Sequence, residues 1–187
     1  MQLTDGVAEL HPDSPLRRAA LEIEAHVAEQ GWDQAPRLFA LVPTADLVAA
    51  EPHLADQLGT GTDGSFTPVE QDGLPADHGF EDALDAIEWP DAVAGCAAVV
   101  ERLMLPPEAE DDLPTDLDEL ATFVAQHPGR REVRLVAAVL RGGQAHSAVR
   151  SRGATAEAEA ADSQLLEGPD LVPGLVRRLA STLDRHG

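Results

Sequence analysis

The chain has 187 residues, of which 34 are acidic and 13 are basic, and its formal net charge is −21. A chain of this length fits one domain, which buries roughly 70% of the surface of the unfolded chain. So acidic a protein repels polyanions, and this argues against direct binding of nucleic acid or of an anionic membrane.

The missing residue types exclude several kinds of chemistry. Lysine, asparagine and tyrosine are absent, so the chain cannot form a Schiff base, complete a phosphate-binding P-loop or supply a phenolic acid. Residues 1–6 show no basic region followed by an apolar stretch, and no apolar run approaches the ~18 residues of a membrane span. These patterns predict a cytoplasmic protein.

The first predicted elements are a helix and a buried strand. Ser14 and Pro15 are typical of a helix start, and apolar residues at helical spacing predict a helix over 15–30. The apolar run 37–42 predicts a buried strand. Residues 1–13 are expected to form a flexible N-terminus.

Short helical turns and an edge strand are predicted next. Thr44 is placed to cap a short helix over 46–50, and a further turn or two runs to Leu58. Turn-forming residues then lead to a strand over 65–70. Pro68 confines this strand to a sheet edge, because proline has no N–H to donate to a neighbouring strand.

The middle of the chain combines the longest predicted strand with an acidic segment. A helix is predicted over 79–88 and a strand over 94–105. A further helix that begins at Thr115 is expected to bury one apolar stripe. That stripe consists of Leu117, Leu120, Ala121 and Val124. The acids of the segment 108–119, some of which oppose the positive end of the helix dipole, are Glu108, Glu110, Asp111, Asp112, Asp116, Asp118 and Glu119.

A β-hairpin gives the clearest structural signal. The segments 132–141 and 144–152 flank a Gly-Gly pair, which suits a two-residue turn with positive φ. In this register Leu135 pairs with Arg150. The first segment is apolar on both faces, which predicts a strand inside the sheet, whereas the half-polar second segment is expected nearer an edge.

The C-terminal part is expected to hold a loop or frayed helix over 153–164 and then a final helix capped by Asp170. This helix faces inward through Val172, Val176, Leu179 and Leu183. Together the elements predict a single α+β domain over 14–187, with a mixed, mainly antiparallel sheet of about five strands and helices packed on it.

The hairpin region carries a local excess of positive charge. Residues 130–152 hold six arginines and one acid, Glu132. A basic segment on an acidic body either is neutralised by the chain's own acids or holds an anionic partner. The candidate residues for anion or partner binding are Arg134, Arg141, His146, Arg150 and Arg152.

Three interpretations of these residues stay open. In the first, the arginines pair with the acids of 108–119 or lie solvated at a sheet edge. In the second, Arg141, His146 and Arg150 converge on a carboxylate or phosphate. In the third, His146 acts as a catalytic base.

No other group of residues points to chemistry. Cys96 lies in an apolar run and is expected to be a buried, inert thiol. The seven histidines are scattered and none has the spacing of a metal site. Glu101 and Arg102 alternate faces on the long strand, so one of them is expected in an internal ion pair.

Several segments of the sequence are familiar in combination. They are Trp32 with 37–42, 89–95, 101–103 with 106–107, 132–135 and 168–175. In these the chain resembles a family of uncharacterised single-domain proteins from actinobacteria, whose GC-rich genomes also account for the missing lysine, asparagine and tyrosine. The resemblance runs from about residue 14 onward. It implies a small cytoplasmic protein, with no functional residues to transfer.

The function predicted from these observations is that of a non-enzymatic interaction or regulatory module, with a basic hairpin on an acidic body. It needs no cofactor or metal, and its partner is a protein, with a homodimer as one arrangement. The alternative is a small-anion or nucleotide-binding protein, or a hydrolase, that uses His146 with Arg141 and Arg150. An acidic decoy for a nucleic-acid-binding protein is a third class.

Overall fold

A computed structural model describes residues 14–72, 74, 79–153 and 165–185. The predicted flexible N-terminus over 1–13 and nearly all of the predicted loop over 153–164 lie outside the described residues.

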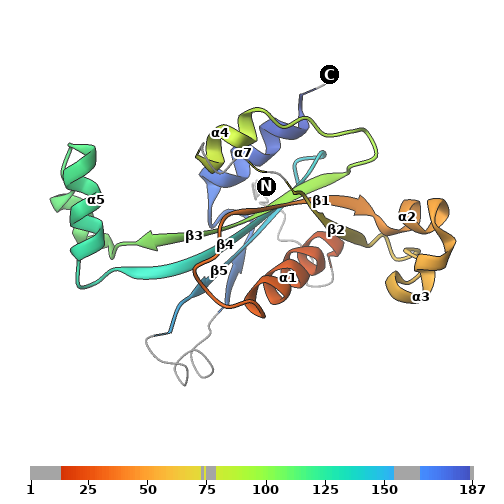
Figure 1. Ribbon diagram of the computed structural model, residues 1–187, viewed down its shortest axis with the longest axis horizontal. Coiled ribbons are helices and arrows are strands. Elements are labelled where there is room, and N and C mark those ends of the chain that lie inside the picture. The colour runs from red at the N-terminus through yellow and green to blue at the C-terminus, as the bar shows by residue number, and fades with distance from the viewer. Residues whose placement is uncertain (1–13, 73, 75–78, 154–164, 186–187) are drawn as a thin grey trace, which may run out of the picture.

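The protein is built on one antiparallel sheet of six strands in the order β2-β1-β3-β4-β5-β6 (Figure 1). The strands are β1 (Arg37–Pro43), β2 (Phe66–Glu70), β3 (Gly95–Met104), β4 (Arg131–Leu140), β5 (Ala145–Ser151) and β6 (Leu165–Gly168). The α+β prediction is confirmed, and so are the edge position of β2 and the central position of β4. The sequence prediction missed β6, whose four residues are too few to show an alternating pattern, and β6 rather than β5 forms the second edge.

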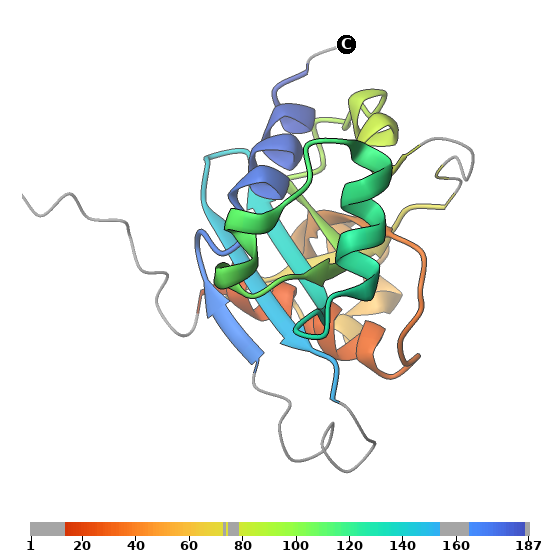
Figure 2. The ribbon, with the colours of Figure 1, turned by 90° about the vertical axis from the view of Figure 1, so that its left-hand side faces the viewer.

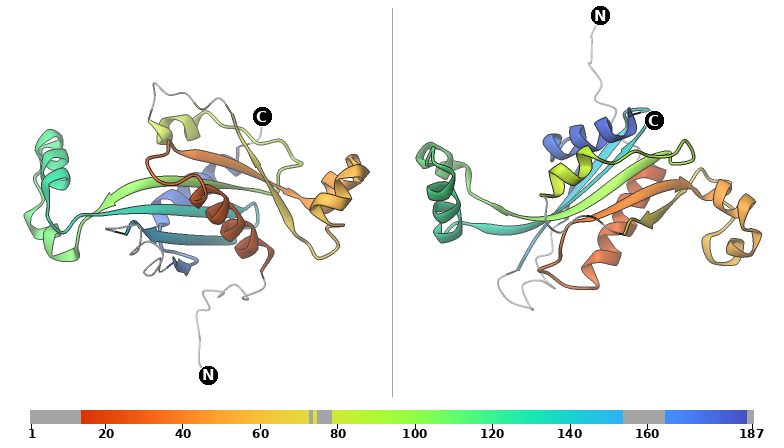
Figure 3. Two further views of the ribbon diagram at one scale, coloured as in Figure 1. Left: turned by 60° about the horizontal axis from the view of Figure 1, so that its bottom comes forward. Right: turned by 45° about the horizontal axis from the view of Figure 1, so that its top comes forward.

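Helices cover both faces of the sheet. Helix α1 (Pro15–Ala28) lies on one face, and α4 (Phe80–Asp85) and α7 (Pro173–Leu183) lie on the other, as Figure 3 shows. The remaining helical segments are α2 (Thr44–Ala50), η1 (Pro52–Leu54), α3 (Ala55–Leu58), η2 (Pro107–Asp112) and α5 (Leu117–Gln126).

Two apolar layers form the core, one on each face of the sheet. Successive residues of a strand point to opposite faces, so Ala97 and Val99 of β3 pack in the layer of Ile23 from α1. Ala98 of the same strand packs in the layer of Leu179 from α7. Because small side chains fill the middle strands, the helices on both faces approach the sheet closely.

The hairpin forms as predicted, but its register differs by one residue. The loop has three residues, 141–143: the N–H of Gly143 donates to Leu140 O at 2.9 Å, and Gly143 has a φ of 88°. A turn followed by a glycine in the left-handed region is the usual form of a three-residue hairpin loop. Leu135 therefore pairs with Val149, and Arg150 pairs with Arg134.

Three details of the helix predictions are wrong. Thr44 is buried as the first residue of α2 and bonds Thr67 through its hydroxyl at 2.9 Å, so it does not cap that helix. The residue before α7 is Val172, not Asp170, and its side chain makes no capping bond. Helix α4 ends at Asp85 rather than near 88.

The structure confirms that Cys96 is buried, and burial raises the pKa of its thiol to about 12. Compared with the ordinary value of 9.0, this leaves about a thousandfold less thiolate at neutral pH.

We expect iodoacetamide to modify Cys96 only as the protein unfolds, so that the alkylation rate, followed by mass spectrometry, rises along the urea unfolding curve. Modification of the folded protein at the rate of a free thiol would contradict this.

Candidate functional site

Two of the candidate arginines lie side by side at one end of the sheet. Arg134 and Arg150 are directly opposite each other on β4 and β5. Arg134 is 1% exposed, its guanidinium lies 4.4 Å from the centre of the Trp32 ring, and its Nη2 donates to Gly31 O and to Glu101 Oε1, the latter at 3.2 Å. Like charges opposite each other in a sheet repel, so each arginine requires an acid of its own.

Arg150 receives that acid from α1. Its Nε and Nη2 donate to the carboxylate of Glu24, with 2.9 Å between Nη2 and Oε2. Glu24 is only 3% exposed. The hydrogen bonds to Glu24 raise the pKa of Arg150 above its ordinary value, so the guanidinium stays charged. This buried ion pair attaches α1 to β5.

Arg152 lies at the rim of the same region. Its Nη1 donates to Glu132 Oε2 at 2.6 Å and to Asp33 Oδ1 at 3.1 Å. Its guanidinium also lies 5.6 Å from the centre of the Trp32 ring. Trp32 therefore contacts both Arg134 and Arg152.

Arg141 lies elsewhere, in the hairpin loop. Its guanidinium donates to four backbone carbonyls: 2.8 Å to Val93, 2.6 Å to Leu183, 3.3 Å to Trp89 and 3.2 Å to Pro90. Trp89, Pro90 and Val93 lie in the segment between α4 and β3, and Leu183 is the last residue of α7. Arg141 thus ties the loop to two neighbouring segments, and it does not converge with the other candidates.

His146 is buried, at 5% exposed, next to a second ion pair. Its Nε2 lies 3.1 Å from Glu167 Oε1 on β6. Arg17 of α1 donates to both oxygens of Glu167 at 2.9 Å. The bonds from Arg17, followed by the bond from His146, hold the pKa of Glu167 below its ordinary value of 4.5. This triad joins α1, β5 and β6.

The arginines of the hairpin pair with acids outside the segment 108–119, which the sequence analysis offered as their partners. Their acidic partners come from α1, β3, β4 and the segment after α1, whereas the predicted partners over 108–119 lie at the far end of the molecule in Figure 1. The predicted internal ion pair on the long strand is confirmed by Glu101 with Arg134. Glu24 could have been found, because it is an acid on the apolar face of a strongly amphipathic helix. A binding role for the five candidate residues stays a prediction.

The acidic segment lies on a projection of the sheet. The outer ends of β3 and β4 continue their pairing beyond the core as far as Met104 and Arg131, and they carry η2 and α5 between them. We call residues 103–131 the arm. Figure 1 shows α5 at the end of the arm, away from the other helices, and Figure 2 views the molecule from that end.

The predicted burial of an apolar stripe on α5 is wrong. None of the residues of α5 is buried, and Leu117 is 80% exposed. The physical reason is the arm itself, which carries α5 beyond the layers that cover the body of the sheet. Three further large apolar residues of the arm are exposed, namely Leu103, Met104 and Leu113.

The arm also concentrates negative charge. Within the described residues, none of its seven acids over 108–119 forms a salt bridge. A shallow hollow of about 420 Å³ lies beside α5. Its lining combines apolar Pro114 and Phe123 with acidic Asp118 and Glu119.

The described part of the chain contains neither a metal-holding group of side chains nor a helix that could cross a membrane. Residues 14–72, 74, 79–153 and 165–185 contain no group of three or more histidine, cysteine, aspartate or glutamate side chains placed to hold a metal ion. No helix in these ranges combines the length and apolar character required to cross a membrane.

Comparison with known proteins gives one match. A family model described as PPA1309-like protein matches residues 16–184. No curated protein and no solved structure matches the chain.

The buried pair between α1 and β5 predicts an asymmetric response to substitution. Arg150→Met leaves the carboxylate of Glu24 buried without its guanidinium, and we expect the free energy of unfolding to fall by about 3–5 kcal/mol. Adding Glu24→Leu removes the unpaired charge and should restore stability to within about 1 kcal/mol of the wild type. Urea unfolding followed by circular dichroism measures both. If Arg150→Met is as stable as the wild type, the proposed structural role of the Glu24–Arg150 pair is wrong.

The triad around Glu167 predicts a pH dependence. Because the pKa of Glu167 is lowered in the folded protein, its contribution is fully present above the unfolded pKa and is lost as the pH falls through the folded pKa. We expect Glu167→Gln to be less stable than the wild type near neutral pH. The difference between their urea midpoints should shrink as the pH is lowered from about 7 to about 3. A difference that does not change with pH would argue against an ionised Glu167 in the triad.

Proposed function

The chain belongs to the PPA1309-like protein family, and we propose that it is a non-enzymatic interaction module whose arm binds a basic, amphipathic segment of a protein partner. The observation that carries this proposal is the exposure of helix α5, which buries none of its residues although it is amphipathic.

The isolation of α5 is energetically costly unless a partner covers it. A helix of 10 residues is marginal in water when tertiary contacts are few. Burying one large aliphatic side chain such as Leu117 is worth roughly 1.5–3 kcal/mol. A partner that covers Leu117 and the neighbouring exposed residues therefore gains apolar burial that the fold of this chain does not supply.

The charge of the arm supports a basic partner. Several acids close to the sheet pair with arginines, for example Glu24 with Arg150 and Glu101 with Arg134. The acids of the arm have no such pairs within the described ranges, so their negative potential is available to an approaching cation. Complementary charge raises the association rate and favours one partner over others.

The lining of the hollow beside α5 suits a basic side chain in its chemistry. Pro114 and Phe123 offer an apolar surface for the aliphatic stem of a lysine or arginine, and Asp118 and Glu119 offer carboxylates for its head group. This combination supports a partner segment in which basic residues alternate with apolar ones.

Origin and location belong to the same proposal. The family resemblance and the absence of lysine support an actinobacterial source. The single cysteine, which is buried and free, supports a reducing compartment such as the cytoplasm.

The test is a charge reversal on the arm. The double variant Asp118→Lys, Glu119→Lys should lower the affinity for a partner captured from source cells by about tenfold or more, where tenfold is equivalent to ~1.4 kcal/mol. Leu117→Ser should also lower the affinity for this partner, because the apolar side chain that the partner would bury is lost. The substituted side chains are exposed, but Asp118 and Glu119 lie in the first turn of α5, so circular dichroism must show that each variant keeps its helix content before the affinities are compared. Affinity is measured with the purified partner, and cross-linking identifies the segment that it places on the arm.

A matched control lies at the opposite end of the molecule. Glu51→Lys with Asp56→Lys changes the net charge equally, beside α2 and α3 (Figure 1). We expect this control to bind as the wild type does. The proposal fails if the arm variants bind with unchanged affinity, if the control is weakened to the same degree, or if the cross-linked segment is acidic or belongs to a second copy of this chain.

A further inference from the structure

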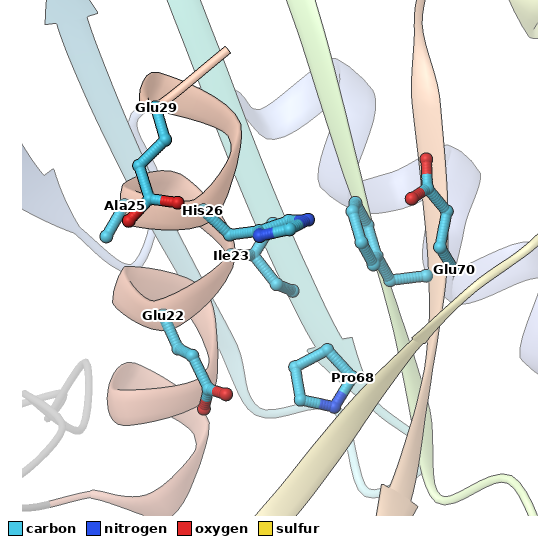
Figure 4. A pocket seen from close by; sticks show the side chains of 8 residues that line it. Glu22, Ile23, Ala25, His26, Glu29, Pro68 and Glu70 are labelled. Carbon is cyan, nitrogen blue, oxygen red and sulfur yellow. The ribbon is translucent and has the colours of Figure 1, made fainter.

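A groove separates α1 from the edge strand β2. It has a volume of about 460 Å³, within the usual range of roughly 300–1,000 Å³ for small-molecule sites. Its apolar surface comes from Ile23, Phe39 and Pro68. Figure 4 shows the side chains of Glu22 and His26 extending from α1 toward the strand side of the groove.

The rim of the groove is acidic. Glu22 and Glu29 on α1 and Glu70 on β2 all line it. Arg37 compensates Glu70, because its Nε and Nη2 donate to the two carboxylate oxygens at 2.6 Å and lower the pKa of Glu70. The carboxylates of Glu22 and Glu29 are exposed and form no salt bridge within the described residues. Two carboxylates without a salt bridge in the described residues therefore flank His26 at the rim.

The protein already holds one of its own cations in this way. The guanidinium of Arg37 lies 5.6 Å from the centre of the Phe39 ring while it bonds Glu70. A cation over an aromatic face and beside a carboxylate gains from both interactions. Phe39 also lines the groove, together with His26 and the exposed acids Glu22 and Glu29.

We propose that the groove between α1 and β2 binds a small organic cation, an amine carried on an apolar group. The apolar group would lie against Ile23 and Pro68, and the ammonium would lie at the acidic rim, beside Glu22 or Glu29. An anion of the same shape would be repelled by the two carboxylates and by the net charge of −21. This site lies on the body of the sheet and does not depend on the arm.

The isoleucine content of the chain provides a direct test. There are two isoleucines: Ile23 lines the groove, and Ile87 packs in the core layer on the other face of the sheet. In protein labelled at the isoleucine methyl groups, phenethylamine should shift the NMR signal of Ile23 in a saturable manner and leave Ile87 in place. Phenylacetate, which has the same ring and the opposite charge, should shift neither signal.

A pair of double variants tests the contribution of the acids. Glu22→Gln with Glu29→Gln should weaken phenethylamine binding by up to about fivefold, the upper end of the effect expected for one exposed ion pair. Glu88→Gln with Asp91→Asn makes the same change in net charge at exposed positions outside the groove and should bind as the wild type does. The proposal is overturned if phenethylamine leaves Ile23 unshifted, if phenylacetate shifts it equally, or if both double variants weaken binding to the same degree.

Discussion

Two arginines that face each other across the central strands are the constraint on which the arrangement of this fold depends. Arg134 and Arg150 are paired in the β4–β5 ladder, where like charges repel. Each is held by a carboxylate that is itself largely removed from water: Glu24 from α1 and Glu101 from β3. Leaving any one of these four groups unpaired in the interior would cost several kcal/mol, on the order of 3–5 kcal/mol. The position of α1 over the sheet is therefore fixed by charge as well as by apolar packing.

The same physical requirement recurs along the edge of the sheet. Arg17, also on α1, binds Glu167 of β6, and His146 of β5 contacts the same carboxylate. Of the two leucines of the short strand β6, Leu165 packs against the core layer below α1, and Leu166 is 58% exposed. The attachment of β6 to the sheet depends on this one apolar contact, on backbone pairing with β5 and on the polar triad. Helix α1 thus joins two strands that lie side by side at one end of the sheet order.

The parts of the fold that could be predicted from the sequence are those that local pattern determines. The apolar run of β4 indicates a central strand whatever lies beside it, and the Gly-Gly pair indicates a turn. The pair does not determine the loop length, because both a two-residue loop and a three-residue loop with Gly143 in the left-handed region satisfy it. That ambiguity shifted the predicted partner of Arg150 by one residue and concealed its position opposite Arg134. Periodicity correctly marked the apolar face of α5, but periodicity alone does not show whether another element covers that face.

The arm separates the acids of 108–119 from the rest of a strongly acidic chain. Many acids near the sheet pair with arginine in the folded protein. Because the chain has only 13 basic residues for 34 acidic ones, most of its acids have no basic partner. Packing the seven acids of 108–119 against an already negative body would add repulsion at short range. Projection on the arm places them farther from that body, where salt screens the repulsion over a Debye length of about 8 Å. The same separation leaves their potential uncompensated at a surface that also exposes apolar side chains. In the proposed function, the repulsion that the extended β3–β4 hairpin relieves is the source of the attraction for a basic partner.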